Sequence, residues 1–277
     1  MNEFRRIAGL VFTCGEVAVR AVSGLRILEF IKEYFMHSVI RKTAFSLLLS
    51  LGASSFIMAL PADFMTKLEA DSRPDGDKAR DGARRPYQVM TLAGIQEGWT
   101  VIDVAAGGGW YTRVLSAAVG PTGKVISQVG PRALQNNNGQ SVRDLAASLG
   151  NVEPFFENMA DIPAGSADAA VTALNFRDAY NFRGEAGAQG FLKEIYNALK
   201  SGGVAVIIDH AGTIEMDNAN LHRIPVVIAR AQIQAAGFQI VRESDILHTS
   251  ADDHSISSND PTLGRNTDRF LFVVRKP

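Results

Sequence analysis

Short apolar runs alternate with amphipathic segments through the second two thirds of the chain. Apolar runs bounded by turn residues predict buried strands at 99–104, 124–129, 152–157, 167–174, 204–209, 238–243 and 269–275. Apolar residues spaced three and four apart predict helices at 87–94, 111–119, 141–149, 188–199 and 225–236. Because strands that alternate with helices form βαβ units, we expect an α/β domain with a seven-stranded, mostly parallel sheet and helices on both faces.

The first 62 residues have a different pattern. From Met36, two basic residues precede an apolar centre at 44–51 and a stretch of small residues up to Ala62. This is the layout of a secretory signal peptide. The uncharged stretch 43–62 also has the ~20 residues that a membrane-spanning anchor needs, but its serines favour a cleaved signal.

We therefore expect three parts: an extension at 1–35, a signal peptide or membrane anchor at 36–62, and a folded domain at 63–277. Signal peptides stand at the amino terminus, so the extension is explained most simply if translation starts at Met36. This organisation predicts a periplasmic or secreted protein, with attachment to the inner membrane as the alternative. Contact with a membrane is expected only through residues 36–62.

Composition and charge narrow the possible partners. The 277 residues are 46% hydrophobic and 21% charged, as in ordinary globular proteins, and the net charge is −1. No cluster of Lys and Arg is dense enough to follow a phosphate backbone, so nucleic acid is not expected as a partner. The only cysteine is Cys14, which excludes disulfides, Cys-ligated zinc and Cys nucleophiles from residues 63–277.

Three consecutive glycines, Gly107, Gly108 and Gly109, follow the first predicted strand. Without side chains at a strand-to-helix turn, a ligand can touch the main chain, and the amides there can bind a carboxylate or phosphate. A tight turn without a ligand is the alternative, although three glycines lose more conformational entropy than tightness requires. Thr112 stands where the dinucleotide pattern needs glycine, which weighs against a nicotinamide-dependent oxidoreductase.

The stretch from Asp103 to Gly109 resembles the first motif of class I S-adenosylmethionine-dependent methyltransferases, D-x-G-x-G-x-G, with Ala105 in place of the first glycine. Other stretches resemble this family in order and spacing: Asp161–Pro163 with Ser166–Asp168, Leu199–Val204, and Ala235–Phe238. A narrower resemblance is to a bacterial group of predicted exported methyltransferases, through Gly107–Thr112, Asn175–Asp178, Asp209-His210 and Leu221–Arg223.

The resemblance implies a Rossmann-like fold whose last strand is antiparallel, and S-adenosyl-L-methionine as the cofactor. It implies that the cofactor contacts Asp103, Ala105, Gly107, Gly108, Gly109, Tyr111, Gln128, Asp161 and Asn175. Gln128 stands at or beside the position where the family usually has an acid for the ribose hydroxyls. An amide can still bond a hydroxyl there, but without the assistance of charge.

Polar side chains also follow the fourth and fifth strands, at the sheet edge where α/β proteins bind ligands. Methyl transfer needs positioned reactants and in some cases a base. The candidates for this chemistry are Asp178, Asp209, His210 and His222, with helix capping, surface ion pairs and structural histidines as the alternatives. The spacing of Asp252, Asp253 and His254 fits no standard ligand pattern, so we expect no metal ion.

The sequence thus predicts a methyltransferase that acts on a small molecule. The alternative is an exported non-catalytic or repurposed ligand-binding protein that keeps the fold, because S-adenosylmethionine has no obvious route across the membrane. The polar connection 244–268 is long for a compact domain, and we expect it to be a lid over the substrate.

Overall fold

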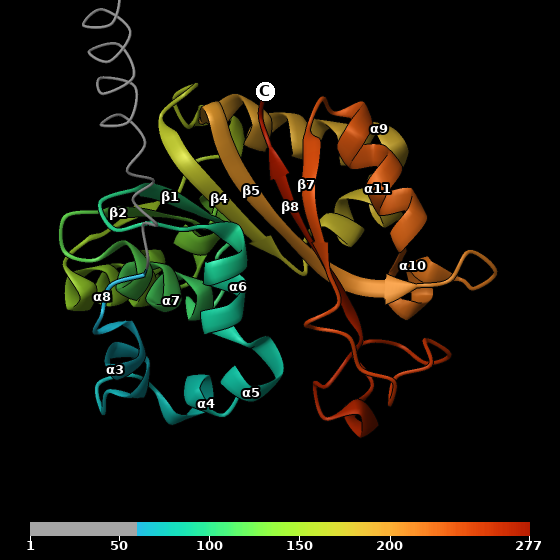
Figure 1. The fold of residues 1–277 in the computed structure, drawn as a ribbon, viewed down its shortest axis with the longest axis horizontal. Helices are drawn as coiled ribbons and strands as arrows, with labels where there is room; N and C mark the ends of the chain where they lie inside the picture. The colour runs from blue at the N-terminus through green and yellow to red at the C-terminus, as the bar shows by residue number, and fades with distance from the viewer. Residues whose placement is uncertain (1–59) are drawn as a thin grey trace, which may run out of the picture. The chain divides into compact units, whose positions relative to one another are not determined.

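The computed structural model of the protein describes residues 60–277 (Figure 1). The extension 1–35 and nearly all of the predicted export segment 36–62 lie outside the described residues. Among residues 60–277, no helix combines the length and the apolar character that crossing a membrane requires.

Seven strands form one sheet in the order β3-β2-β1-β4-β5-β8-β7. Their bounds are β1 Thr100–Val104, β2 Lys124–Gln128, β3 Val152–Phe155, β4 Ala167–Ala173, β5 Leu199–Gly212, β7 Gln239–Ser244 and β8 Arg269–Arg275. Strands β1 to β5 pair in parallel, whereas β8 runs antiparallel between β5 and β7. This confirms the predicted Rossmann-like α/β fold with its antiparallel last strand.

Helices pack on both faces of the sheet. Their bounds are α3 Phe64–Glu69, α4 Asp75–Lys78, α5 Asp81–Arg84, α6 Pro86–Ala93, α7 Trp110–Val119, α8 Gln140–Leu149, α9 Phe176–Ala198, α10 Asn218–Leu221 and α11 Val226–Ala235. One apolar cluster joins α9 and α11 to the sheet, and a second joins α3, α6 and α7 to its opposite face. Successive strand residues point to opposite faces, so Phe270 belongs to the first cluster and Leu271 to the second. Burial on both faces explains why the strands are almost continuously apolar.

Three elements differ clearly from the prediction. Helix α9 begins at Phe176, twelve residues before the expected start at 188, and Gly184 interrupts it with a φ of 64°. Phe176, Ala179 and Tyr180 have a helical spacing, but polar residues follow at 181, 183 and 185, so the pattern is too short to predict a helix. Strand β5 runs from Leu199 to Gly212, where 204–209 was expected. Strand β6 (Ile224–Pro225) has two residues, pairs with β5 outside the main order and is too short to show a pattern.

The carboxyl ends of β1, β4 and β5 lie at one edge of the sheet, and two segments distant in sequence flank that edge. Figure 1 shows α4 and α5 on one side and the connection between β7 and β8 on the other. Ligands of open α/β sheets bind at this edge. The candidate site is therefore assembled from residues near 80, near 107, near 210 and near 265.

Candidate active site

The loop between β1 and α7 turns through left-handed backbone conformations. Gly107 and Gly109 have φ values of 57° and 79°, and Ala105 has a φ of 52°. An L-residue pays about 1–2 kcal/mol for this conformation. The Ala105 N–H donates to Oε1 of Gln128 at 3.0 Å, which helps to hold the turn where the family motif has glycine.

Gln128 shapes this loop from the end of β2. Its side chain is buried, its Oε1 accepts from Ala105 N, and its Nε2 donates to the carbonyl oxygen of Glu157 at 3.1 Å. Both polar ends of the amide thus bond to main chain. A contact to ribose, as expected from the family motif, would have to share one of these groups.

Neighbouring glycines in the loop meet different constraints. A Cβ on Gly108 would meet no atom within 4 Å and its φ is not left-handed, whereas a Cβ on Gly109 would overlap Cδ2 of Leu145. Gly109 thus allows α8 to pack closely against the start of α7. Gly108 leaves its main chain open on the ligand side.

We expect Gly109→Ala to lower the free energy of unfolding by roughly 1–3 kcal/mol, because it adds both a strained φ and an overlap. Gly108→Ala should change it by less than about 0.5 kcal/mol. Urea unfolding of the two variants tests this contrast, and equal losses would show that the loop packs differently.

Asp103 is buried beneath the loop at the end of β1. Its Oδ2 accepts from the Thr112 hydroxyl at 2.6 Å, and that hydroxyl lies 3.2 Å from Oγ of Ser127. Burial raises the pKa of Asp103 to about 7, against the opposing effects of the Thr112 hydrogen bonds and the charge of Arg84. Thr112, which broke the dinucleotide pattern, therefore holds the acid of the motif.

A cavity of about 240 Å³ opens over the glycines, and we call it the loop cavity. It is lined by Arg80, Arg84, Asp103–Gly108, Trp110, Tyr111 and Ala173–Asn175. Small-molecule sites usually have about 300–1,000 Å³, so the loop cavity has room for one end of a nucleoside ligand. An acid beneath open amides suits the amino-acid end of S-adenosylmethionine, and the residues present fit that group.

Of the other residues expected to contact the cofactor, Asn175 and Tyr111 line the loop cavity and Asp161 does not. Asn175 lines it and donates to the carbonyl oxygens of Ala173 at 2.9 Å and Val104 at 3.4 Å, which joins the ends of β4 and β1. Tyr111 also lines it, edge-on to Trp110. Asp161 is exposed, caps a short 3-10 turn through the Asn158 N–H, and does not line the loop cavity.

A second cavity of about 830 Å³ adjoins the first, and we call it the arginine cavity. It is lined by Gly76, Ala79, Arg80, Ala83, Arg84, Leu174, His210, Ser258–Pro261, Gly264, Arg265, Thr267 and Arg269. Arg80, Arg84 and Leu174 line both cavities, so the two spaces share a wall. The connection predicted as a lid supplies the residues from Ser258 to Thr267, which places it over this cavity.

His210 alone among the four residues expected to do chemistry lines the arginine cavity. It is only 6% exposed, and its Nδ1 is buried without a hydrogen-bond partner among the described residues. Burial, followed by the charges of Arg177, Arg269, Arg223 and Arg84, lowers the pKa of His210 to about 2. The imidazole is therefore neutral at pH 7.

Asp209 points away from its neighbour His210 because successive residues of a strand face opposite sides. Its carboxylate is fully buried and accepts from the main-chain N–H of Arg177 at 2.8 Å and from the Arg177 guanidinium at 3.0 Å. Burial raises the pKa of Asp209, and Arg177 acts against this rise. Asp209 thus holds the start of α9 and lines neither the loop cavity nor the arginine cavity.

Asp178 and His222 also lie outside both cavities, unlike the expected position beside the reacting groups. Their side chains face each other, with 4.0 Å between Oδ1 of Asp178 and Nδ1 of His222, and both are more than a third exposed. His222 ends α10 with a φ of 52°. The early start of α9 and the short helix α10 turn these two residues to the surface.

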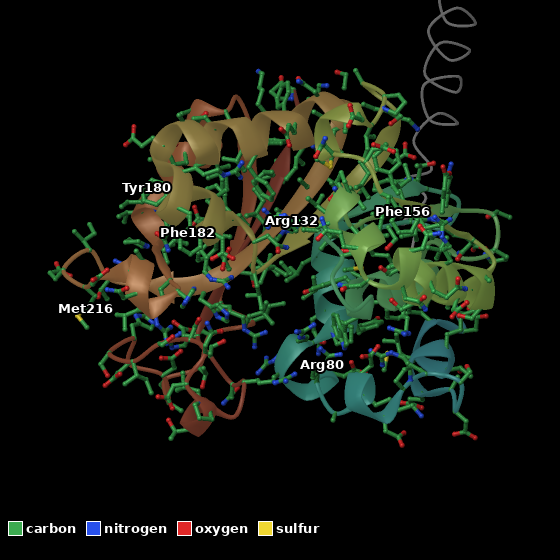
Figure 2. All side chains as sticks on the ribbon, turned by 180° about the vertical axis from the view of Figure 1, so that it is seen from behind. Arg80, Arg132, Phe156, Tyr180, Phe182 and Met216 are labelled. Carbon is green, nitrogen blue, oxygen red and sulfur yellow. The ribbon has the colours of Figure 1, made fainter. Side chains whose placement is uncertain are left out.

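The arginines of the site were not among the residues chosen from the sequence. Arg80 directly precedes α5 (Figure 2), and Arg84 is the last residue of that helix. Arg269 is the first residue of β8, almost 190 residues after Arg80. One sequence signal was available for Arg269, since a charged residue is unusual at the start of an otherwise apolar strand. Its position opposite His210 follows from the β5–β8 register.

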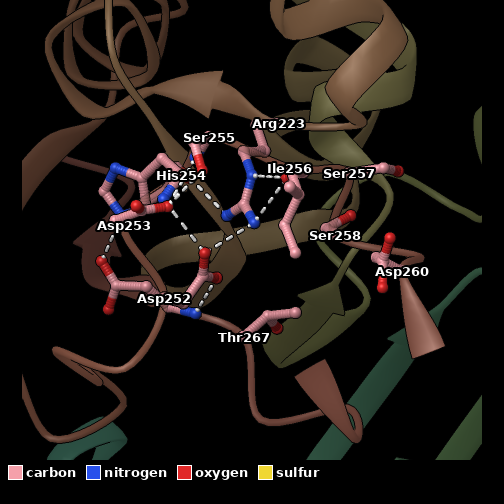
Figure 3. A network of polar contacts seen from close by, with 12 residues as sticks. Arg223, Asp252, Asp253, His254, Ser255, Ile256, Ser257, Ser258, Asp260 and Thr267 are labelled. Atoms are coloured by element: carbon pink, nitrogen blue, oxygen red, sulfur yellow. Dashed lines mark hydrogen bonds and ion pairs between the residues drawn. The ribbon is translucent and has the colours of Figure 1, made fainter. Parts of the chain in front are cut away.

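The wall formed by the β7–β8 connection is held by a buried ion pair (Figure 3). The guanidinium of Arg223 donates to Oδ1 of Asp252 at 2.8 Å and to the carbonyl oxygens of Ile256 and Ala211. The other oxygen of Asp252 accepts from the Asp268 N–H at 2.7 Å. Among the described residues, no three His, Cys, Asp or Glu side chains are grouped as metal ligands, and Asp252 serves the ion pair instead.

Comparison with known proteins places this site in a family. The family model described as the ubiE/COQ5 methyltransferase family matches residues 83–221, half of the chain. The chain belongs to this family. The match includes Asp103, the three glycines and His210, and it ends before the residues of the β7–β8 connection.

Individual proteins resemble this ubiE/COQ5 family member in sequence or, for the solved structures, in fold. The ubiquinone/menaquinone biosynthesis C-methyltransferase of Escherichia fergusonii is 24% identical over 179 residues, which cover 62% of this chain and 69% of the relative. A SAM-dependent methyltransferase structure from Aquifex aeolicus has 20% identity and a TM-score of 0.54, covering 76% of this chain and 98% of its own. The structure of the [4+2]-cyclase SpnF is 16% identical with a TM-score of 0.54, and the match covers 76% of this chain and 85% of SpnF.

The family and the fold together identify an S-adenosylmethionine-dependent methyltransferase, as the glycine loop predicted. They imply S-adenosylmethionine as the methyl donor. The alternative of a non-catalytic binding protein is not favoured.

Proposed function

We propose that the protein transfers the methyl group of S-adenosylmethionine, bound over the glycine loop, to a small molecule in the arginine cavity. The shared wall of Arg80, Arg84 and Leu174 carries this proposal, because it places the two cavities side by side at the same edge of the sheet. When bound, S-adenosylmethionine supplies an electrophilic methyl carbon, which bonds to the acceptor while the S–CH₃ electron pair stays on the sulfur of S-adenosylhomocysteine.

The chain's own residues contribute position and charge. The main chain at Gly107 and Gly108 is open to the ligand's carboxylate, and the Asp103 carboxylate attracts its positive groups. Neutral His210 lines the arginine cavity from β5, where it can accept a hydrogen bond from the acceptor and help to orient it. Holding both reactants in one geometry is the largest contribution expected of the protein.

Calorimetric titration of the full chain with S-adenosylmethionine and with S-adenosylhomocysteine tests the cofactor half of the proposal. Both compounds should bind in a 1:1 ratio and raise the midpoint of thermal unfolding, since a ligand of the native state stabilises it. The absence of heat and of any midpoint shift with both compounds would contradict the proposal.

Affinity for S-adenosylmethionine should increase with pH because of Asp103. Its pKa of about 7 lies above the ordinary 3.8, so at pH 6 the carboxyl is largely protonated and must lose its proton to hold a cation. The dissociation constant should fall by up to about tenfold between pH 6 and pH 8. Titrations at the two pH values measure this fall, and Asp103→Asn should remove the dependence.

The raised pKa of Asp103 should also make the stability of the protein depend on pH. The native state binds the Asp103 proton more tightly than the unfolded state, so this group's contribution to stability is present below about pH 4 and is lost as pH rises towards 7. Asp103→Asn should therefore be more stable relative to the wild type at pH 8 than at pH 5. An unchanged difference would show that Asp103 ionises normally.

We also propose that residues 36–62 direct export, so that the domain from 63 onward works in the periplasm or outside the cell. The basic start, apolar centre and small residues of this segment support the proposal. Amino-terminal sequencing of the mature protein should find a first residue near 63. A mature chain that begins at residue 1 would contradict export, and a membrane-bound chain that retains 43–62 would favour the anchor.

A further inference from the structure

We infer that the methyl acceptor is an anionic small molecule whose carboxylate or phosphate binds between Arg84 and Arg269 in the arginine cavity. The acceptor role rests on the function proposed above. The anion site itself rests on the charge and burial of the cavity wall, and it can be tested without any methyl transfer.

The wall of the arginine cavity carries a strong excess of positive charge. Four guanidinium groups, those of Arg80, Arg84, Arg265 and Arg269, face one carboxylate, that of Asp260. Asp260 is exposed and already caps a 3-10 turn through Thr262. The ionised wall therefore attracts an anion rather than a neutral molecule, and the large excess is unusual for a protein whose net charge is −1.

Three of these arginines have no carboxylate partner among the described residues. Arg80 pairs with Asp77, whereas Arg84, Arg265 and Arg269 form no ion pair there. Of the four buried arginines in the described part of the chain, Arg73, Arg177 and Arg223 pair with a carboxylate and Arg269 alone does not. Arg84 is half-buried and Arg265 is exposed. The one buried guanidinium without a carboxylate partner among these residues therefore lies in the wall of the arginine cavity.

Arg269 is the most deeply placed of the three. It is 5% exposed, and its Nε and Nη2 donate to the carbonyl oxygens of Thr267 at 3.2 Å and Ala83 at 2.8 Å. These bonds leave Nη1 without a hydrogen bond among the described residues. A buried cation without a counter-ion is costly, and an anion that enters the cavity would offset that cost.

Arg84 adds a second cation beside Arg269, whose Nη2 donates to the carbonyl oxygen of Ala83, the residue before Arg84. The Arg84 guanidinium lies 4.7 Å from the centroid of the Trp110 ring and makes no hydrogen bond among the described residues, so its donors remain available. Burial lowers the pKa of both Arg84 and Arg269, which agrees with two cations held together out of water. The planar fork of a guanidinium binds carboxylate and phosphate through two bonds at once.

His210 provides an independent observation that points to a ligand. It is more than nine-tenths buried, lines the arginine cavity and lies opposite Arg269 in the β5–β8 register, and its buried Nδ1 has no hydrogen-bond partner among the described residues. Of the groups packed around it, Arg269, Arg223, Arg84 and Arg177 are cations, and buried Asp209 on the far face of β5 is bonded to Arg177. Burial is the main reason why the imidazole is unprotonated, and the charges of the arginines add to it. An anion between the arginines would offset part of those charges.

The test compares charged and neutral probes that share a phenyl ring, on the full chain. Dissociation constants are measured by NMR titration for benzoate and phenyl phosphate, with benzamide and phenol as neutral controls, at constant ionic strength. At least one anion should bind at least tenfold more tightly than its neutral control and should move the imidazole signals that His210→Gln removes. The stronger of the two anions identifies carboxylate or phosphate as the preferred group.

Variants then locate the binding. Arg84→Gln should weaken anion binding at least tenfold, whereas Arg132→Gln, an exposed arginine labelled in Figure 2 that does not line the cavity, should leave it unchanged. Equal affinity for charged and neutral probes, or equal affinity of the Arg84→Gln variant and the wild type, would overturn the inference. If Arg84→Gln does not fold, the probe comparison on the wild type decides alone.

Failure of this inference is distinguishable from failure of the proposed function. S-adenosylhomocysteine binding in the same samples reports on the loop cavity and does not need an anion. Binding of S-adenosylhomocysteine without anion preference would overturn the inference and leave the methyltransferase site standing. Anion binding without S-adenosylhomocysteine binding would support the anion site and contradict the assigned cofactor site.

Discussion

Replacing Arg223 by methionine should lower the free energy of unfolding by about 3–5 kcal/mol, because it leaves the Asp252 carboxylate buried without its partner. Both side chains of this pair are 0% exposed, and the guanidinium also serves two main-chain carbonyl oxygens of the domain. The substitution would therefore leave both carbonyl oxygens, as well as the carboxylate, without their Arg223 donors. A loss of this size is a large part of the total stability of a typical domain.

Urea unfolding of the full chain measures this effect, and Arg230→Met is the matched control. Arg230 pairs with Glu243 on the surface, where the two side chains are 37% and 45% exposed, so its removal should cost about 0–1 kcal/mol. Similar losses of unfolding free energy in the two variants would contradict a stabilising role of the buried Arg223–Asp252 ion pair. The double variant Arg223→Met with Asp252→Leu should recover much of the stability, because it removes the unpaired charge as well.

The contribution of the Arg223–Asp252 ion pair to stability should also depend on pH. Burial alone would raise the pKa of Asp252, but hydrogen bonds from the Asp268 N–H, Arg223 and the His254 N–H outweigh burial and lower it. A lowered native pKa means that the carboxylate's contribution is present above its unfolded pKa near 4 and is lost as pH falls further. Arg223→Met should therefore be most destabilising near neutral pH and less so in acid.

Replacing Gly108 by valine should weaken S-adenosylmethionine binding by at least 100-fold, or about 2.7 kcal/mol. The added side chain meets no protein atom at its Cβ, and it occupies the space over the loop where the ligand must touch the main chain. Because the backbone at Gly108 is not left-handed, the fold should tolerate the change. Binding would thus be lost without loss of structure.

Calorimetric titration with S-adenosylmethionine measures this loss, and urea unfolding verifies that the variant is folded. Gly190→Val is the matched control, because a Cβ at Gly190 also meets no atom within 4 Å but lies on α9 away from both cavities. The control should bind S-adenosylmethionine like the wild type. Wild-type affinity in Gly108→Val would show that the cofactor does not lie over this loop.

Local patterns predicted most of the elements of the domain. The strand expected at 269–275 has the observed bounds, because its apolar run between two charged ends is short and consists mainly of aromatic and β-branched residues. Helix α9 was predicted only from its second half, where apolar residues return with a helical period. In its first half, Asp209 caps the first turn through the Arg177 N–H, a contact that spans 32 residues, and Phe176 packs into the core.

Within the site, the sequence by itself determined the turn that exposes the main chain. Three glycines directly after a buried strand, with Asp103 four residues before the first of them, indicate a turn with an accessible main chain. These properties depend on neighbours along the chain, so a local pattern can show them.

Only the tertiary structure decided where the arginine cavity lies and which residues form it. Arg84, His210 and Arg269 meet because β8 inserts between β5 and β7 and because α5 reaches the same sheet edge. It also separated His210 from Asp209, Asp178 and His222, since strand alternation and helix ends turn the other three away. The physical reason is that the arginines of this cavity come from segments distant in sequence and are brought together by tertiary contacts. The spacing of residues within one segment does not predict such contacts.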